Sequence, residues 1–249
     1  MTAANLGEVL NISESTIVRF ANSLGYSGYR ELQKELQELI KHKLTTVQRI
    51  TLNDYSNKEN ALSKVMEKDI DNVKKTIQEI DIKSFNKAID LILQSRHIYI
   101  IGLRSSAFLS GYLSFYLNFI FDNVKLVTEG PNDVFEQLIM AGKDDVVIGI
   151  TYPRYSRRTL EAIDLVKSKG CSIISITDSL LSPAAHRADI SLIARSDMIS
   201  FVDSLVAPMS LINALIVSLG ARKRDDITNY FEDLELIWKK YNVYDENNI

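Results

Sequence analysis

Five short apolar runs between residues 97 and 195 constrain the fold of this chain more than any other feature. Each run is rich in Ile and Val, and stretches with helical periodicity separate the runs. Such runs are typical of strands buried on both faces, and their alternation with helices is typical of a parallel sheet. We therefore expect an α/β fold with a five-stranded parallel sheet sandwiched by helices. The expected strands are residues 97–101, 124–128, 145–151, 171–177 and 189–194.

The N-terminal part of the chain has a different pattern. Residues 1–44 contain no strand-like run and predict a small all-α domain made of short helices. Residues 45–58 are polar and without a clear period, so we expect a linker there. Residues 59–249 then form the larger domain, in which two helices, 203–223 and 227–240, follow the last strand. The first of these is strongly apolar and is expected to pack on the sheet or across a subunit interface.

A further helix is expected to begin near residue 59. Its apolar residues recur with spacings of four and three, the period of a helix that buries one narrow stripe. Two interpretations stay open, namely packing on the neighbouring domain and a seam between two copies of the chain. The stripe consists of Met66, Ile70, Val73, Ile77 and Ile80.

Residues 3–22 have the pattern of a helix-turn-helix. Asn11 stands where the turn needs a residue that tolerates the left-handed conformation, and Gly7 lets the two helices cross closely. Ser13 is a natural N-cap for the second helix. The residues expected to face inward are Ile17, Phe20, Ala21 and Leu24 on this helix, and Tyr29, Leu32, Leu36, Leu39 and Ile40 on the next.

The outward side of the second helix suits contact with a DNA major groove. Arg19 and Asn22 are the main candidates for reading bases, and Arg30 is a candidate for contacting backbone phosphate. The alternative is a small helical module that does not bind DNA. Residues 1–45 carry five basic and five acidic side chains and therefore no net charge. The candidate DNA-binding residues are Ser15, Thr16, Arg19, Asn22 and Arg30.

Two expected strands end in loops whose residues suit an anionic ligand. Ligands of open parallel sheets bind beyond the carboxyl ends of the strands, where helix N-termini offer backbone N–H groups. The first loop supplies a glycine and two serines, and the second supplies hydroxyls and arginines. Serine at such a position is also a common structural N-cap. The candidate ligand-binding residues are Gly102, Ser105, Ser106, Thr151, Arg154, Ser156 and Arg157.

These motifs resemble a known bacterial family. Residues 12–20 (ISESTIVRF) and 24–29 (LGYSGY) are similar to the helix-turn-helix of RpiR-type sugar-responsive regulators. Residues from about 80 to 220 resemble the sugar isomerase (SIS) domain that binds phosphosugars in that family, on the strength of the first loop, of residues 144–150 (DDVVIGI) and of 176–178 (ITD). In the family, further helices precede the reading pair, so we expect a partial DNA-binding domain with weak affinity for DNA.

The chain departs from the family pattern in both candidate loops. Arg104 stands where the first loop usually has its second glycine. The bulky sequence TYPRYS, residues 151–156, replaces the small glycine-containing loop that usually follows the third strand. Such a loop either fills the pocket or provides arginines for an effector with more negative charge than a simple sugar monophosphate.

The resemblance implies a DNA-binding transcriptional regulator controlled by a phosphorylated sugar or a related anionic metabolite. Its implied partners are operator DNA, the effector and further copies of the chain, as a homodimer or homotetramer. Two alternatives are a phosphosugar isomerase and a non-sensing oligomerisation scaffold whose pocket is plugged by Tyr152, Arg154 and Tyr155.

Composition excludes several other classes. The net charge of −3 argues against a broadly basic nucleic-acid coat, and no apolar run reaches the length of a membrane span, so a cytoplasmic protein is expected. Cys171 is the only cysteine, and the three histidines have no zinc-ligand spacing. We expect no metal, no cofactor and no catalytic residue, because Glu129, Glu161 and His186 are more typical of solvated side chains than of an isomerase base.

Overall fold

The computed structural model describes residues 2–33, 36, 47–48, 50, 60–198 and 201–244. The chain divides into two compact units, Met1–Ser56 and Asn57–Ile249, and each is described by itself. Most of the linker expected over residues 45–58 lies outside the described residues, as do Leu39 and Ile40.

The larger unit contains a five-stranded sheet in which every pair of neighbouring strands is parallel. The order of the strands is β2-β1-β3-β4-β5, so the fold predicted from the apolar runs is confirmed. Each strand lies inside the range expected for it. The strands are β1 (Ile98–Ile101), β2 (Val124–Val127), β3 (Val146–Ile150), β4 (Ser172–Thr177) and β5 (Ile190–Ile193).

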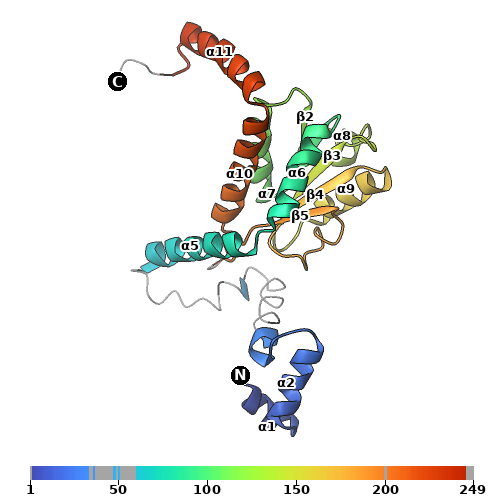
Figure 1. The fold of residues 1–249 in the computed structure, drawn as a ribbon, viewed down its shortest axis with the longest axis vertical. Helices are drawn as coiled ribbons and strands as arrows, with labels where there is room; N and C mark the ends of the chain where they lie inside the picture. The colour runs from blue at the N-terminus through green and yellow to red at the C-terminus, as the bar shows by residue number, and fades with distance from the viewer. Residues whose placement is uncertain are drawn as a thin grey trace. The chain divides into compact units, whose positions relative to one another are not determined.

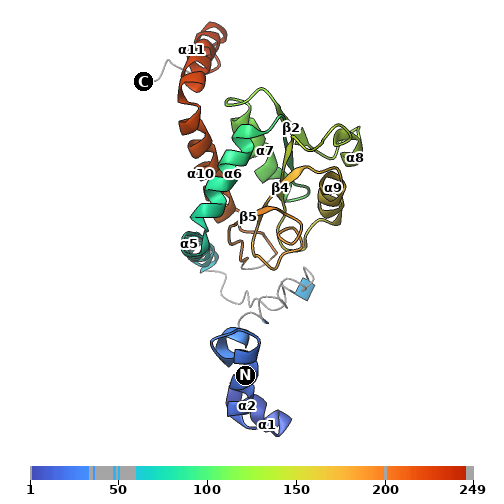
Figure 2. The same ribbon diagram turned by 45° about the vertical axis from the view of Figure 1, so that its right-hand side comes forward.

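Helices cover both faces of this sheet, as Figures 1 and 2 show. One apolar cluster joins one face to α6 (Ile82–Gln94), α7 (Ser106–Leu117) and α10 (Val206–Arg222), and a second joins the other face to α8 (Val134–Gln137) and α9 (Arg157–Ser168). Alternate residues of β1 enter the two clusters, which follows from the two-residue period of a strand. Apolar side chains therefore cover both faces of the sheet, so a ligand can reach the sheet only at the ends of its strands.

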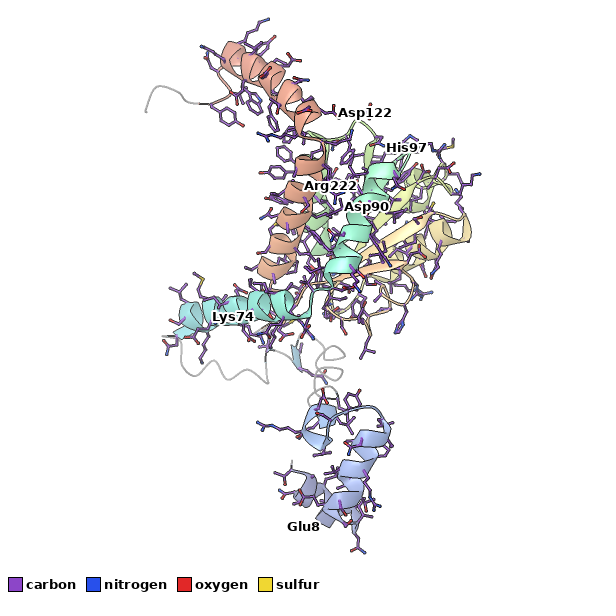
Figure 3. All side chains as sticks on the ribbon, viewed as in Figure 1. Glu8, Lys74, Asp90, His97, Asp122 and Arg222 are labelled. Carbon is purple, nitrogen blue, oxygen red and sulfur yellow. The ribbon has the colours of Figure 1, made fainter. Side chains whose placement is uncertain are left out.

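The C-terminal helices extend this unit beyond the sheet. Helix α10 packs its apolar side into the first cluster, which confirms the expectation that it packs on the sheet. Arg222 near its end pairs with Asp90 of α6 at 3.1 Å (Figure 3). The final helix, α11 (Arg224–Tyr241), has no buried residue, and the ring centroid of its Phe231 lies 5.4 Å from that of Phe119, just after α7.

Helix α5 (Ala61–Glu79) turns its polar side toward the unit. Its buried residues are Asn72 and Thr76, whereas Met66, Ile70 and Ile77 are exposed. The interpretation that the apolar stripe of α5 is buried by packing is therefore wrong for these three residues. The physical reason is that the buried side of α5 meets the polar segment that follows β5, whose backbone needs hydrogen-bond partners.

The N-terminal unit contains α1 (Ala3–Leu10) and α2 (Glu14–Ser23). Asn11 ends α1 in the left-handed conformation (φ 52°), and the Ser13 hydroxyl accepts a hydrogen bond from the backbone N–H of Thr16. A Cβ at Gly7 would lie 2.7 Å from the carbonyl oxygen of Ile12, so only glycine allows this close turn. The turn chemistry predicted from the sequence is confirmed.

Among the described residues of this unit, fewer of the expected inward side chains are buried than predicted. Ile17, Ala21 and Leu32 are buried, but Phe20 and Leu24 are more than half exposed, and Leu36 is exposed as well. The expected inward positions of these last three residues are wrong. Ile17 and Ala21 lie one turn apart on the stripe that meets α1, and the eight residues of α1 are too few to cover a wider face.

Candidate functional site

The order of the strands locates the candidate ligand site. The chain runs from β1 outward to β2 and then returns to the other side of β1 to form β3, so the direction of winding reverses between β1 and β3. In open α/β sheets, ligands bind at this switch point, outside the carboxyl ends of the strands. Residues Ile101 and Gly149 are paired across the two strands, so the loops that follow lie next to each other.

The loop after β1 needs its glycine because it approaches β3 closely. A Cβ at Gly102 would lie 2.8 Å from the carbonyl oxygen of Ser106 and 3.1 Å from that of Ile150. Arg104 follows with a φ of 58°, and its side chain is exposed. The Ser105 hydroxyl does not cap α7 but donates a 2.7 Å hydrogen bond to Oδ2 of Asp203.

The loop after β3 begins with the buried Thr151, and Arg154 then adopts a φ of 66°. The Ser156 hydroxyl accepts a hydrogen bond from the backbone N–H of Thr159 and caps α9, as predicted. Arg157 is exposed and pairs with Glu161 at 2.7 Å. The two loops thus place the N-termini of α7 and α9 at the same edge of the sheet.

Two hydroxyls of buried residues at this edge have no partner. Ser106 and Thr151 are 4% and 2% exposed, and neither hydroxyl makes a hydrogen bond to the part of the chain that the structure describes. Neither hydroxyl oxygen is among the fully buried atoms without a partner, so both reach the surface of the loops. A ligand with acceptor oxygens between the two loops could accept from both.

Sequence reasoning missed a polar group at the end of β4. The Tyr155 hydroxyl donates to the buried carboxylate of Asp178 at 3.0 Å, and the Thr177 hydroxyl donates to it at 3.1 Å. Burial, followed by the negative charge of Asp178, raises the pKa of Tyr155 above its usual value. Tyr152 is buried beside this group and its hydroxyl has no hydrogen-bond partner among the described residues. The position of Asp178 directly after an apolar strand was the available signal.

The side chains weighed as an isomerase base are placed as solvated groups. Glu129 and His186 are exposed, and Glu161 forms an ion pair with Arg157. Cys171 is buried, and burial raises the pKa of its thiol, so it is a poor nucleophile. Among the described residues, no group of three or more His, Cys, Asp and Glu side chains could hold a metal ion, and none of the helices there could cross a membrane.

The candidate DNA-reading residues lie on the outer side of the N-terminal unit. All five, Ser15, Thr16, Arg19, Asn22 and Arg30, are exposed. The hydroxyls of Ser15 and Thr16 each lie 2.8 Å from the Ser13 hydroxyl at the start of α2, so both are part of the helix cap. Residues 15, 19 and 22 follow the spacing of one helix face.

Comparison with known protein families assigns both units. A SIS domain matches residues 91–218, more than half of the chain, and a helix-turn-helix domain of the rpiR family matches residues 1–43. The chain belongs to the RpiR family. Its SIS domain contains all five strands and the switch point, and its helix-turn-helix domain contains α1 and α2.

Relatives described as HTH-type transcriptional regulators span most of the chain. An uncharacterized HTH-type transcriptional regulator of Caldanaerobacter subterraneus is 25% identical over 94% of this chain and 83% of its own length. The HTH-type transcriptional regulator HexR of Pseudomonas aeruginosa is 24% identical over 98% of this chain and 87% of its own length.

Solved structures agree with the fold. The sugar isomerase domain of an RpiR transcription factor from Sphaerobacter thermophilus superposes with a TM-score of 0.68, at 24% identity over 71% of this chain and 99% of that one. The NanR protein of Vibrio vulnificus, complexed with ManNAc-6P, superposes with a TM-score of 0.61, at 19% identity over 95% of this chain and 85% of that one.

Proposed function

We propose that this RpiR-family chain is a transcriptional regulator in which the helix-turn-helix domain reads an operator and the SIS domain binds a phosphorylated sugar or a related anion. The observation that carries the proposal is the pair of unpartnered hydroxyls of the buried residues Ser106 and Thr151, at the switch point of a domain joined to a DNA-reading motif. The complex of NanR with ManNAc-6P supports a phosphosugar ligand.

Ligand binding at this site follows from donors that the two loops present. The hydroxyls of Ser106 and Thr151 can donate to phosphate oxygens, and the first backbone N–H groups of α7 and α9 add donors together with the positive ends of two helix dipoles. Gly102 keeps the loops close enough for one ligand to reach both. Ser105, Ser156 and Arg157 complete the proposed set around this phosphate, and Arg154, in the same loop, binds another part of the ligand.

The reading of DNA is assigned to one exposed face of the N-terminal unit. Arg19 and Asn22 contact base edges, Ser15 and Thr16 lie at the start of the reading helix, and Arg30 contacts backbone phosphate. We place the reading domain at residues 1–44 and the sensing domain at 59–249, joined by a linker at 45–58. Replacing Arg19 with Ala is expected to weaken operator binding by about 1–3 kcal/mol, while Arg222→Ala on the sensing domain leaves it unchanged.

A homodimer or homotetramer gives the regulator two readers for one operator. The exposed stripe of Met66, Ile70 and Ile77 on α5 offers an apolar surface for a second copy of the chain. Ligand binding then controls DNA binding by favouring one arrangement of the subunits over another.

An isomerase is the second candidate, because solved neighbours of the SIS fold include a putative sugar-phosphate isomerase of Listeria monocytogenes. The positions of Glu129 and His186 away from the core and the ion pair of Glu161 favour a binding domain. Turnover of any bound sugar phosphate would decide for the enzyme.

A thermal-shift panel of sugar phosphates and amino-sugar phosphates tests the proposal. A ligand at 100 times its dissociation constant stabilises its domain by about 2.7 kcal/mol. We expect at least one compound to raise the melting temperature, and Thr151→Val and Ser106→Ala to abolish the shift. Ser168→Ala, which removes an exposed hydroxyl from the far end of α9, is the matched control. A panel without any shift, for a folded protein, would contradict the proposed ligand class.

A further inference from the structure

Two arginines hold left-handed backbone conformations, one in each loop of the ligand site. Arg104 has a φ of 58° and Arg154 a φ of 66°. Residues with a Cβ rarely adopt this conformation, which is most easily adopted by glycine. Both side chains are exposed at the edge where the N-termini of α7 and α9 meet. The chain thus presents a cation at each of two loop positions that glycine would suit better.

A single phosphate does not need both arginines. The unpartnered hydroxyls of Ser106 and Thr151 and the N–H groups of the two helix ends already offer donors for one phosphate. Two exposed guanidinium groups in the same two loops offer further donors for an anionic group, at an edge that also carries the carboxylates of Asp178 and Asp203. These donors favour a ligand that carries negative charge at a second place.

We infer that the ligand is a sugar phosphate with a second anionic group, either a carboxylate or a second phosphate, bound by Arg104 and Arg154. This inference rests on the proposed function and specifies its ligand. Arginine binds either group through paired hydrogen bonds, so the two ligand types share one recognition chemistry.

Calorimetric titration with three probes tests this specificity. Fructose 6-phosphate carries one anionic group, fructose 1,6-bisphosphate carries two phosphates, and 6-phosphogluconate carries a phosphate and a carboxylate. We expect the two doubly anionic probes, or the one whose second group fits, to bind at least about tenfold more tightly than fructose 6-phosphate.

The variants Arg104→Gly and Arg154→Gly remove each side chain while leaving a residue that favours the observed backbone. They are expected to lose most of the tenfold preference and to keep the affinity for fructose 6-phosphate. Arg222→Ala, at the end of α10, is the charge-matched control. Equal affinity of the wild-type protein for all three probes would overturn the inference and leave the proposed function standing. Absence of binding by all three would contradict both.

A second, independent set of contacts joins the ligand site to α5. Asp203, which accepts the hydrogen bond from Ser105, is followed by Ser204, whose hydroxyl donates to Oδ1 of Asp69 on α5 at 2.5 Å. The Ser204 carbonyl oxygen also accepts a 2.8 Å hydrogen bond from the Ser196 hydroxyl. One short segment therefore contacts the site through Asp203 and α5 through its next residue.

Asp197, which precedes this segment in the chain, also binds α5 through hydrogen bonds and an ion pair. The side chain of the buried Asn72 donates to the carbonyl oxygen of Asp197 at 2.9 Å and accepts from its N–H at 3.2 Å. Lys68 pairs with the Asp197 carboxylate at 2.8 Å. Burial raises the pKa of this carboxyl group, but Lys68 and Lys75 outweigh burial and hold the pKa below its usual value. Asp197 thus stays charged and bound to α5 at neutral pH.

An anion at the first loop opposes the contact between Ser105 and Asp203. It competes for the Ser105 hydroxyl as an acceptor, and its negative charge repels the Asp203 carboxylate. Helix α5 belongs to the sensing unit and follows the reading unit along the chain. We propose that the Ser105–Asp203 hydrogen bond transmits occupancy of the ligand site to α5, through Ser204 and Asp69.

Amide hydrogen exchange of α5 in the ligand-free protein tests this coupling without knowledge of the ligand. Ser105→Ala and Asp203→Ala break the contact from its two sides, and each is expected to raise exchange of the amides around Asp69 and Asn72 several-fold. Asp90→Ala, which breaks an ion pair between α6 and α10, is the control and leaves α5 unchanged. Unchanged exchange of α5 in both test variants would overturn the coupling, whatever the outcome of the ligand panel.

Discussion

The two units of this chain, called here the reading unit (Met1–Ser56) and the sensing unit (Asn57–Ile249), differ in how much of their stability can come from their own cores. The sensing unit buries both faces of its sheet in two apolar clusters, so it contains a complete core. Among its described residues, the reading unit buries the apolar side chains of Ile17, Ala21 and Leu32 and leaves Phe20 and Leu24 exposed. We therefore expect the described part of this unit to contribute only marginal stability from its own buried apolar surface.

This difference shows that apolar packing defines the structure of one unit, whereas local turn residues define much of the other. In the sensing unit, packing of the strands and helices in the two apolar clusters fixes the backbone. The side chains of the loops at the switch point can therefore differ without a change of fold. In the reading unit, local turn chemistry at Gly7, Asn11 and Ser13 supplies much of what defines the structure. Changes of the same kind should therefore have unequal consequences in the two units.

Replacing one tightly packed glycine in each unit gives the largest expected effect. A Cβ would lie 2.7 Å from a carbonyl oxygen at Gly7 and 2.8 Å from one at Gly102. Gly7→Val and Gly102→Val should each cost about 3 kcal/mol of folding free energy. We expect the first to unfold the reading unit and the second to lower the urea midpoint of a sensing unit that stays folded.

Amide exchange resolved by peptide distinguishes these outcomes within the full chain. Gly28→Ala and Gly111→Ala are the matched controls, since a Cβ at either position has no heavy atom within 4 Å. If the reading unit tolerates Gly7→Val as well as the sensing unit tolerates Gly102→Val, the two units do not differ as described.

Acid should destabilise the sensing unit through one buried carboxylate. Burial raises the pKa of Asp145, but hydrogen bonds from Arg96, Gly142 and His97 outweigh burial and lower the pKa from 3.8 to about 2. Because the pKa is lower in the folded state, this group stabilises the unit above pH 3.8 and loses its effect as the pH falls toward 2. The contribution is about 2 kcal/mol.

Urea midpoints measured from pH 7 to pH 2 check this dependence. Asp145→Asn should lower the midpoint at pH 7 and flatten its fall with acid, whereas Asp90→Asn, in an exposed pair, should change neither. An unaltered acid dependence in Asp145→Asn would show that other carboxylates control the stability of this unit.

Loss of the helix cap should affect the reading unit alone. Ser13→Ala removes the acceptor for the N–H of Thr16 and should cost about 1 kcal/mol. That amount is a large share of the stability of a small unit, so exchange of α2 amides should rise about fivefold. Ser13→Asp, which keeps a capping oxygen, should restore protection. A variant Ser13→Ala with normal protection would mean that the cap does not limit the stability of this unit.

The smallest expected effect is a gain in the sensing unit. Glycine at residue 104 or 154 relieves a left-handed backbone and should stabilise the unit by up to about 1 kcal/mol, which a thermal melt detects. A loss of stability in Arg104→Gly would mean that the side chain is held by the folded unit.

Much of this structure could be predicted from residue patterns. The five apolar runs indicated the strands and their parallel arrangement, and Asn11 and Ser13 indicated the turn between α1 and α2. The orientation of α5 could not be predicted, because its apolar spacing is visible in the sequence while the polar partners of Asn72 and Thr76 come from residues more than a hundred positions away.

The candidate site was predictable only in part, for the same reason. The two loops follow strands, so Gly102 and Thr151 could be identified from position alone. The contact of Ser105 with Asp203 joins residues 98 positions apart, and Asp178 reaches Tyr155 only because β3 and β4 are neighbours. Contacts of this kind depend on the assembled sheet.

Amide hydrogen exchange of the whole chain during titration with inorganic phosphate tests the central claim most directly. If the switch point of the SIS domain is the anion site, added phosphate should protect residues 102–107 and 151–159 before any other segment, and Thr151→Val should abolish that protection. Protection confined to other segments, or equal in the wild-type protein and Thr151→Val, would contradict the claim that the regulator senses its ligand at the loops after β1 and β3.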